Sequence, residues 1–458
     1  MTHEPITREP VTREPVTRDR WTHLFELLAL GIALLTIAWG PLAQGSTPWW
    51  GQAGLTLLGL ATWMVTLIAL SLRGRVVTVR PIWLMAILGF LGWIWLSTLW
   101  APYKLEGYRL AGVWTAVLGV ALTLHLLVTT ARRQTAALTV LVLTAAGALA
   151  LAYLQTRGFL VPGFHYYPGA GPTLVTGPYF NPSHFSGYLI PVAAVLTSLL
   201  LLTRPHLHSL VLIGLLVLLH WMNFKTDASS IPAVLLATLT PLLVWIWTKN
   251  RILGRTLLAL EVVVVAVGVP AFLSPQGQAF FASHRQLIGL NNSWDQFLQG
   301  RRAVWRYGLE VWKAHPLEGA GSGQFLSESP RYRVSELESG SVVESMSVNY
   351  AHNDLLQIAS EFGGVGVLFF VLILILPLWT RRGGLGALIW WSALPPLLVS
   401  GIYDAHLSVI PGTMMTAFTL IALATVDTKR SIKHDSSEQE AKQLELPVMD
   451  GSPAPEVK

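Results

Sequence analysis

The sequence predicts an all-α integral membrane protein, and three observations carry this prediction. Only 12% of the 458 residues are charged, against about 25% in soluble domains. The apolar residues gather in runs long enough to cross a bilayer as helix, for which about 20 residues are needed. These runs lack the alternation of apolar and polar residues that marks the strands of a membrane barrel. Each crossing is therefore predicted to be a helix, which satisfies its own backbone hydrogen bonds.

The apolar runs predict about twelve transmembrane helices. They form three groups along the chain, within residues 23–154, 185–273 and 351–425. We place the individual helices at residues 23–43, 51–72, 81–100, 110–130, 136–154, 185–202, 207–224, 230–248, 255–273, 352–379, 385–402 and 407–425.

The positions of lysine and arginine predict the orientation of these helices. Cytoplasmic loops carry an excess of both residues, and alternate loops of this chain are rich in them while the others are nearly bare. The alternation predicts that both termini are cytoplasmic. The basic residues of the predicted inner loops and C-terminal end are Arg73, Arg75, Arg80, Arg132, Arg133, Arg204, Lys249, Arg251, Arg255, Arg381, Arg382, Lys429 and Arg430, and the outer exceptions are Lys104, Arg109 and Lys225.

Two tails and two outer loops complete the predicted organisation. Residues 1–22 repeat a Glu-Pro-x-Thr-Arg unit whose prolines disfavour helix, so they are predicted to form a disordered cytoplasmic tail. Residues 426–458 are polar and charged and are predicted to be a second disordered cytoplasmic tail. On this topology the segments 155–184 and 274–350 both face the outer, periplasmic side. Long loops in compact proteins usually carry function, so the longer one is the predicted catalytic loop.

Composition and missing motifs exclude several classes of function. The chain has no cysteine, which removes disulfides and thiolate chemistry. Its formal charge of +6 is explained by topogenic residues at helix ends, and no basic patch with interleaved aromatics predicts nucleic-acid binding. The sequence holds no Asp-x-Asp, no cluster at metal-ligand spacing and no Walker motif. It therefore predicts neither a metal nor another cofactor.

The segment from Gly300 to Lys313 in the long loop predicts an amphipathic helix. Trp305, Leu309 and Trp312 share one face at helical spacing, and Arg302 and Arg306 share another. Two interpretations fit the arginines. An arginine pair near the outer membrane surface can grip a diphosphate bidentately, or it can contact the headgroups of membrane lipids from an interfacial helix.

Two further polar segments stand next to predicted helices. His352 and Asn353 precede the tenth helix, where the histidine can act as a general base or where Asn353 or Asp354 can cap the helix. Glu361 lies inside the apolar run, and an ionisable group there is a functional candidate. Nine residues separate it from His352, on opposite faces of a regular helix, so a simple His–Glu dyad is not expected.

Three weaker signals remain. The run from His315 to Phe325 contains three glycines spaced by single residues, which can bring backbone N–H groups close to an anion. Asn181 and His184 end the first outer loop and are candidate substrate contacts. Lys225 follows the seventh helix and lies close to Asp227 in sequence, so the two can also pair with each other.

In order along the chain, these motifs resemble the O-antigen ligase and polymerase superfamily of bacterial multi-span glycan-transfer enzymes. The resemblance rests on Gly300-Arg301-x-x-x-Trp305, on Pro316-Leu317-x-Gly319-x-Gly321-x-Gly323-x-Phe325, and on His352-Asn353-x-x-Leu356-x-x-x-x-Glu361-x-Gly363. It is strongest over residues 300–370 and extends more loosely to the Asn181-Pro182-Ser183-His184 segment.

The resemblance implies a metal-independent glycosyltransferase in the bacterial cytoplasmic (inner) membrane. Such an enzyme moves a glycan from an undecaprenyl-diphosphate-linked donor to an acceptor hydroxyl at the outer face. The acceptor is lipid A–core in a ligase of lipopolysaccharide biosynthesis, or a second lipid-linked glycan in a polysaccharide polymerase. By this resemblance His352 and Arg301 are the catalytic candidates, and Arg302 and Arg306 support diphosphate binding. Asn353 and Glu361 are then expected to support the site structurally rather than to contact the substrates.

One departure from the family keeps other functions open. Members often carry Ser-Arg-Gly at the start of the eighth helix, where this chain has Lys225-Thr226-Asp227-Ala228-Ser229-Ser230. Lys225 can replace the charge of the arginine but not its bidentate fork. An inactive homologue that binds lipid-linked glycans is therefore one alternative. A secondary transporter is another, although it predicts internal repeats and mid-span polar sites that the sequence does not show.

Overall fold

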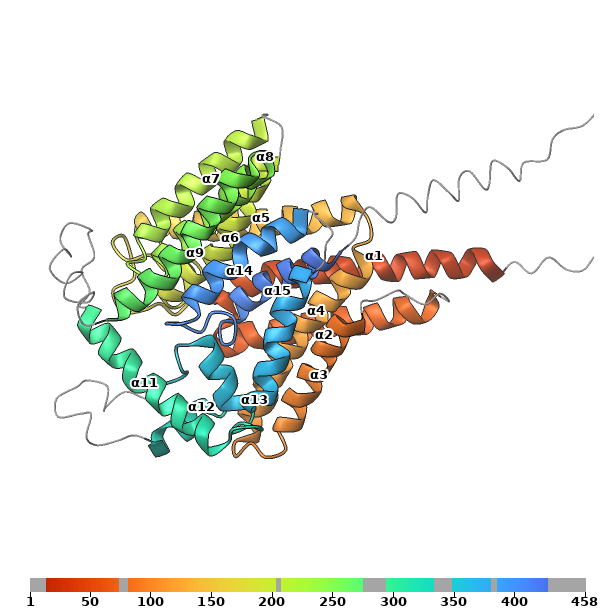
Figure 1. Cartoon of the computed structure of the whole chain (residues 1–458). Helices are drawn as coiled ribbons and strands as arrows, with labels where there is room; N and C mark the ends of the chain where they lie inside the picture. Colours follow the sequence, from red (N-terminus) through yellow and green to blue (C-terminus); the bar gives the residue numbers. More distant parts are fainter. Residues whose placement is uncertain are drawn as a thin grey trace, which may run out of the picture.

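The computed structural model is all-helical throughout the part of the chain that it describes, residues 14–73, 81–202, 207–274, 294–332, 348–379 and 385–426. Long helices form a bundle, and α11 lies at one edge of it beside α12 and α13 (Figure 1). The long helices are α1 (Glu14–Leu42), α2 (Trp49–Leu72), α3 (Pro81–Ser97), α4 (Lys104–Leu127), α5 (Ala131–Thr156), α6 (Pro182–Leu202), α7 (Leu207–Phe224), α8 (Ile231–Lys249), α9 (Arg251–Leu273), α11 (Trp294–Ala314), α13 (Asp354–Ile375), α14 (Leu385–Ser400) and α15 (Pro411–Thr425). Shorter turns are η1 (Gln44–Ser46), α12 (Phe325–Glu328), η2 (Ser329–Tyr332) and η5 (Leu376–Trp379).

Each predicted apolar run folds as a helix, with one correction at the N-terminal end. Helix α1 begins at Glu14, so residues 14–22 are not the disordered segment that the prolines predicted. Pro15 stands in the first turn, where its missing N–H has no intrahelical partner to lose. The rest of both predicted tails, residues 1–13 and 427–458, lies outside the described residues, as do 275–293 and 333–347 of the long loop.

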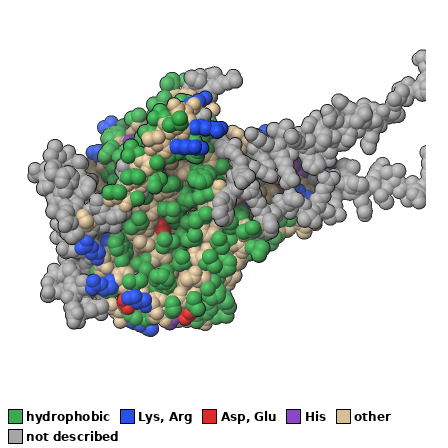
Figure 2. Space-filling model, viewed as in Figure 1, with side chains coloured by type: hydrophobic (Ala, Val, Ile, Leu, Met, Phe, Trp, Pro, Cys, Tyr) green, Lys and Arg blue, Asp and Glu red, His purple; other side chains and the backbone are tan. Residues whose placement is uncertain are grey.

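Among the described residues, seven helices are long and apolar enough to cross a membrane: α1, α2, α4, α5, α6, α7, and α13 with its 3-10 extension. Helices α3, α8, α14 and α15 contain shorter apolar segments. The outward surface of the bundle is apolar as well, with Leu57 on α2 69% exposed and Val262 on α9 65% exposed. Figure 2 shows hydrophobic side chains over the middle of one face and lysine and arginine toward its edges. A surface of this kind belongs in lipid, so the chain is a membrane protein.

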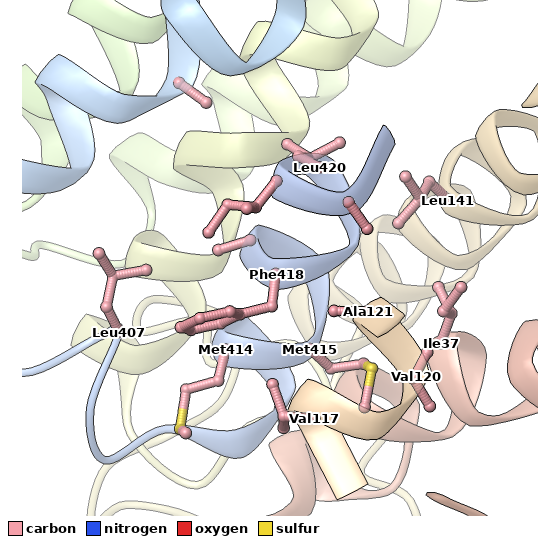
Figure 3. Packing of buried hydrophobic residues seen from close by; sticks show 14 of the residues in the cluster. Ile37, Val117, Val120, Ala121, Leu141, Leu407, Met414, Met415, Phe418 and Leu420 are labelled. Atoms are coloured by element: carbon pink, nitrogen blue, oxygen red, sulfur yellow. The ribbon is translucent and has the colours of Figure 1, made fainter. Parts of the chain in front are cut away.

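Helix α15 forms the centre of the bundle. All of its residues are buried, and it packs against α1, α4, α6 and α14. Its Phe418 meets the Trp114 ring of α4 edge-on at 5.6 Å between centroids, and Met415 points toward Val120 and Ile37 (Figure 3). Because protein surrounds α15 on all sides, its polar threonines can remain inside the bundle, where Thr416 Oγ1 bonds Gly412 O at 3.1 Å.

A buried ion cluster joins three helices at one end of the bundle. Glu26 of α1 accepts from Arg133 of α5 at 2.9 Å and from Arg73, directly after α2, at 3.2 Å. Arg133 also donates to the carbonyl of Leu127 at 2.7 Å, at the end of α4. The two guanidinium groups thus neutralise the buried carboxylate of Glu26 and pair with both of its oxygens. Two of the basic residues predicted for the inner side therefore come to the same end of the molecule.

Helix α13 is broken at Gly363, and the glycine-rich run of the long loop fills the break. Gly363 has φ 64° and ψ −167°, a conformation that only glycine adopts readily. The freed carbonyls of Ser360 and Glu361 accept from Ala320 N at 2.8 Å and Gly321 N at 2.9 Å. In return, Gly364 N donates to Pro316 O at 2.8 Å.

Two tryptophans complete the hydrogen bonding of the break. Trp93 Nε1 donates to the carbonyl of Phe362 at 2.8 Å, and Trp100 Nε1 donates to that of Gly319 at 3.1 Å. A backbone break inside a membrane protein requires such partners, because lipid supplies none. The N–H groups of Ala320 and Gly321 thus bind α13, which corrects the hypothesis that this part of the glycine-rich run cradles an anion.

We predict that Gly363→Ala destabilises the protein strongly. A Cβ at this position would lie 2.1 Å from Leu317 O, and the backbone conformation alone costs about 1–3 kcal/mol for other residues. The thermal unfolding midpoint of the purified protein in detergent should fall by several degrees. Gly92→Ala on α3 is the matched control, since a Cβ there meets nothing within 4 Å. Equal midpoints for the two variants would contradict the role of the break.

Candidate functional site

Asp354 and Asn353 tie together two turns that are far apart in the sequence. The first turn, 348–353, precedes α13, and the second, 401–410, joins α14 to α15. Asp354 Oδ1 accepts from Leu407 N at 2.9 Å and from Ser408 Oγ at 2.7 Å. Asn353 caps α13 by accepting from the backbone of Leu356, and its Nδ2 donates to the Ile402 carbonyl at 2.9 Å. These bonds fix the register of the two turns and thereby place the side chains that they carry.

The two turns bring His352 and Asp404 together. His352 Nδ1 lies 3.3 Å from Asp404 Oδ1, and the Asp404 side chain is 1% exposed. The same carboxylate oxygen accepts from Ala405 N at 2.9 Å, which fixes its orientation. His352 has φ +50°, and its carbonyl accepts from Trp305 Nε1 of α11 at 3.2 Å. The imidazole is thus held at Nδ1, and Nε2 lies on the opposite side of the ring.

His406 is the second histidine at Asp404. Its Nε2 lies 3.9 Å from Asp404 Oδ2 and 3.3 Å from the hydroxyl of Ser230 at the start of α8. The ring packs over Gly187 of α6, where a Cβ would come within 2.3 Å of it. A side chain at position 187 would therefore displace His406.

The charges of this group act on one another. Burial raises the pKa of Asp404, but His406, His352 and Arg301 together outweigh it and hold that pKa well below its usual range. Burial lowers the pKa of His352 below its ordinary 6.5, and Arg301 adds to this, while Asp404 opposes it. At neutral pH the site accordingly holds an ionised carboxylate beside a neutral imidazole. Arg301, in α11 and half-buried, brings the positive charge.

Tyr350 links this group to the first outer loop. Its ring lies 4.0 Å from that of His352 between centroids, and its hydroxyl lies 2.9 Å from His184 Nε2 at the start of α6. Asn181 accepts from Ser183 N at 2.8 Å and so begins this helix, rather than contacting the histidines. The segments 155–184 and 348–350, both predicted to be outer loops, therefore meet at His184 and Tyr350.

Other predicted site residues lie elsewhere. Arg302 and Arg306 are exposed on α11. Lys225 is half-buried in the turn after α7, where its carbonyl accepts from Val175 N of the first outer loop at 2.9 Å. Glu361 is buried at the break in α13 and accepts from Phe325 N at 3.3 Å.

The buried face of α11 differs from the predicted one. Among its described side chains, the apolar stripe consists of Val304, Tyr307 and Val311, each below 5% exposed. Trp305 and Trp312 are only half-buried and bond carbonyls through their indole N–H groups. The tryptophan face was predicted from the helical spacing of its apolar residues, but the helix packs on α13 through the neighbouring face.

Sequence reasoning did not identify Asp404 and His406. The available signal was the segment Tyr403-Asp404-Ala405-His406 between the last two apolar runs, on the predicted outer side. Two ionisable residues in so short a turn between membrane helices are unusual.

A cavity of about 730 Å³ adjoins this group, and His184 and Tyr350 line one part of it. Within the described ranges, no set of three or more His, Asp or Glu side chains is arranged to hold a metal ion.

The fold and the site define a multi-span membrane protein with a buried, charged histidine–carboxylate site beside a cavity that has both apolar and polar lining residues. A family model described as O-antigen ligase matches residues 192–371. It covers Arg301 and His352, and it confirms over these residues the resemblance to the O-antigen ligase and polymerase superfamily. No curated protein matches the chain.

Proposed function

We propose that this protein transfers a glycan from an undecaprenyl-diphosphate-linked donor to an acceptor hydroxyl at the outer face of the bacterial cytoplasmic membrane. The acceptor is lipid A–core if the protein is a ligase, or a second lipid-linked glycan if it is a polymerase. Membership of the matched residues in the family supports glycan transfer in general. The observation that carries the specific proposal is His352 held against ionised Asp404 beside the charge of Arg301.

His352 acts as the general base in this proposal. With a proton on Nδ1 donated to Asp404, the free Nε2 accepts the proton of the acceptor hydroxyl. The hydroxyl oxygen then attacks the anomeric carbon of the donor. Asp404 stays ionised, orients the ring and stabilises the imidazolium that forms, as a carboxylate does for the histidine of a serine protease triad.

Arg301 receives the leaving group. As the bond between the anomeric carbon and the phosphate oxygen breaks, its electron pair goes to the diphosphate, which gains negative charge. A positioned guanidinium stabilises this charge as it develops. The imidazolium then releases its proton to solvent or to the diphosphate, and His352 returns to its neutral form. No step of this scheme requires a metal.

The membrane arrangement follows the same proposal. We propose twelve crossings, the seven long apolar helices together with α3, α8, α9, α14 and α15, with both termini cytoplasmic. Arg73 and Arg133 at one end of the bundle support this orientation. The segments 155–184 and 274–350 then face the periplasm, and the lipid carrier reaches Arg301 laterally from the outer leaflet. Half-exposed α11 lies at the interface, where Arg302 and Arg306 meet phosphates of lipid or donor.

Reconstitution tests the function directly. Vesicles containing the protein, an undecaprenyl-diphosphate-linked oligosaccharide and lipid A–core should form a glycan product and release undecaprenyl diphosphate. His352→Ala should slow transfer by about 10²–10⁴-fold, the usual contribution of a general base. Arg301→Ala should slow transfer by roughly 10²–10³-fold. Arg301→Lys should retain only part of the wild-type transfer rate, because lysine lacks the planar fork of arginine.

The control is Lys313→Ala, which removes an exposed positive charge from the same helix and should leave the rate unchanged. Repeat-unit extension without lipid A–core identifies a polymerase, and a single transfer to lipid A–core identifies a ligase. Full transfer by both His352→Ala and Arg301→Ala would overturn the site.

The pH dependence should report the pKa of His352. Because burial lowers that pKa below 6.5, the transfer rate should rise with pH along an acid limb below 6.5 and be level through pH 7. Asp404 raises the pKa of His352, so Asp404→Asn should shift the acid limb to lower pH and also lower the plateau rate. The measurement is the initial rate of transfer in both proteins between pH 4.5 and 8 (about the range in which a histidine titrates). An acid limb that stays in place or moves to higher pH would contradict the contact.

A further inference from the structure

The lining of the cavity beside the catalytic group contains both ionisable and neutral side chains. The cavity volume of about 730 Å³ lies within the roughly 300–1,000 Å³ typical of ligand sites. His184 and Tyr350 belong to its lining, and the Tyr350 ring lies tilted against the His352 ring, 4.0 Å apart between centroids. Glu106 and Arg109, from the first turns of α4, also line the cavity. Neither Arg301 nor His352 is among its lining residues, so the cavity adjoins the proposed catalytic group without including it.

The charges of the cavity do not suit a diphosphate. Its lining contains the ion pair of Glu106 and Arg109 and the buried carboxyl group of Glu361, so positive charge is not in excess. Phosphates are normally bound where positive charge is in excess. Most of the lining surface is apolar, and side-chain amides, hydroxyls and aromatic rings are distributed within it. Such walls recognise neutral groups that carry many hydroxyls, because amides and carboxylates pair with O–H groups and rings cover the apolar faces of sugars.

Three side chains form a fixed hydrogen-bonding unit in this wall. Arg109 donates from Nε and Nη2 to Glu106 Oε2, at 2.7 and 2.6 Å, and from Nη1 to Gln52 Oε1. Gln52 is itself held on the carbonyl of Thr47 at 3.0 Å. In the described part of the chain these bonds use three of the five N–H donors of Arg109 and one oxygen of Glu106. The side chains of Arg109 and Glu106 are 44% and 47% exposed, so the remaining donors and the second carboxylate oxygen can pair with hydroxyls of a ligand.

We propose that this cavity is the acceptor subsite and that it binds the neutral, hydroxyl-rich sugar at the end of the acceptor. The unit of Gln52, Glu106 and Arg109 holds adjacent hydroxyls of this sugar and determines which acceptor is used. The reacting hydroxyl lies toward His184 and Tyr350; His352 itself does not line the cavity, and its ring lies 4.0 Å from that of Tyr350 between centroids. The donor diphosphate stays at Arg301, outside the cavity. This assignment rests on the proposed function, since it names the second substrate of the same reaction.

Sugar binding without turnover tests the proposal. The full-length protein in nanodiscs is mixed with neutral trisaccharides of glucose, galactose and mannose, and with matched trisaccharides in which one sugar is a uronic acid. Binding is measured by saturation-transfer NMR, and binding of undecaprenyl diphosphate is measured separately by tryptophan fluorescence. Leu105→Ala is the matched control, because Leu105 lies on the same turns of α4 and is 79% exposed.

The wild type should bind at least one neutral trisaccharide in preference to its uronic counterpart. Arg109→Gln and Glu106→Gln should each weaken this binding about tenfold, the size expected for one charge-assisted hydrogen bond. Both variants should bind undecaprenyl diphosphate as the wild type does, and Leu105→Ala should match the wild type in both assays.

The assignment is overturned if no neutral trisaccharide binds, if the uronic series binds more tightly, or if Arg109→Gln also loses undecaprenyl diphosphate. If Arg301→Ala binds undecaprenyl diphosphate as tightly as the wild type does, this result would instead count against the proposed function. The two readouts therefore separate an error in the acceptor subsite from an error in the reaction.

Discussion

The break in α13 at Gly363 is the constraint on which the rest of the site depends. It exposes backbone carbonyls inside the bundle, and the segment 316–321 of the long loop satisfies them. The long loop is thereby bound to α13 a few turns from the end that carries His352. Helix α11 directly precedes this segment and packs against α13. Because Arg301 belongs to α11, this packing also sets the position of Arg301. A membrane helix that continued unbroken would leave the loop without this backbone attachment.

The second constraint is the pairing of the turns 348–353 and 401–410. Asp354 binds the second turn through two hydrogen bonds, and this brings Asp404 to His352. Burial of a carboxylate is expensive unless charge and hydrogen bonds compensate it. Here the charge of Arg301 and the hydrogen bonds from His352 Nδ1 and Ala405 N supply both. A neutral imidazole beside an ionised carboxylate is the state that a general base requires at neutral pH, so the structural arrangement and the proposed chemistry agree.

The sequence predicted the helices well because an apolar run of bilayer length has few other ways to fold. It also predicted that His352 and His184 lie at helix ends in the outer loops. It did not reveal Asp404, because a carboxylate in a short turn looks solvated until Asp354 buries that turn. The role of the glycines at 319 and 321 could not be predicted either, because their local pattern fits an anion-binding turn as well as close backbone packing. The broken helix α13, which their segment contacts, favours the packing role. The buried face of α11 was likewise set by its partner rather than by its largest residues.

The central claim is that Asp404 acts through His352, and a double-mutant cycle on the transfer rate tests it most directly. His352→Ala, Asp404→Asn and the double variant are compared with the wild type in reconstituted vesicles at pH 7. Residues that act as one unit show strongly non-additive losses. The account predicts that the double variant is no slower than His352→Ala alone. Losses that multiply would show that the two residues act independently and would contradict it.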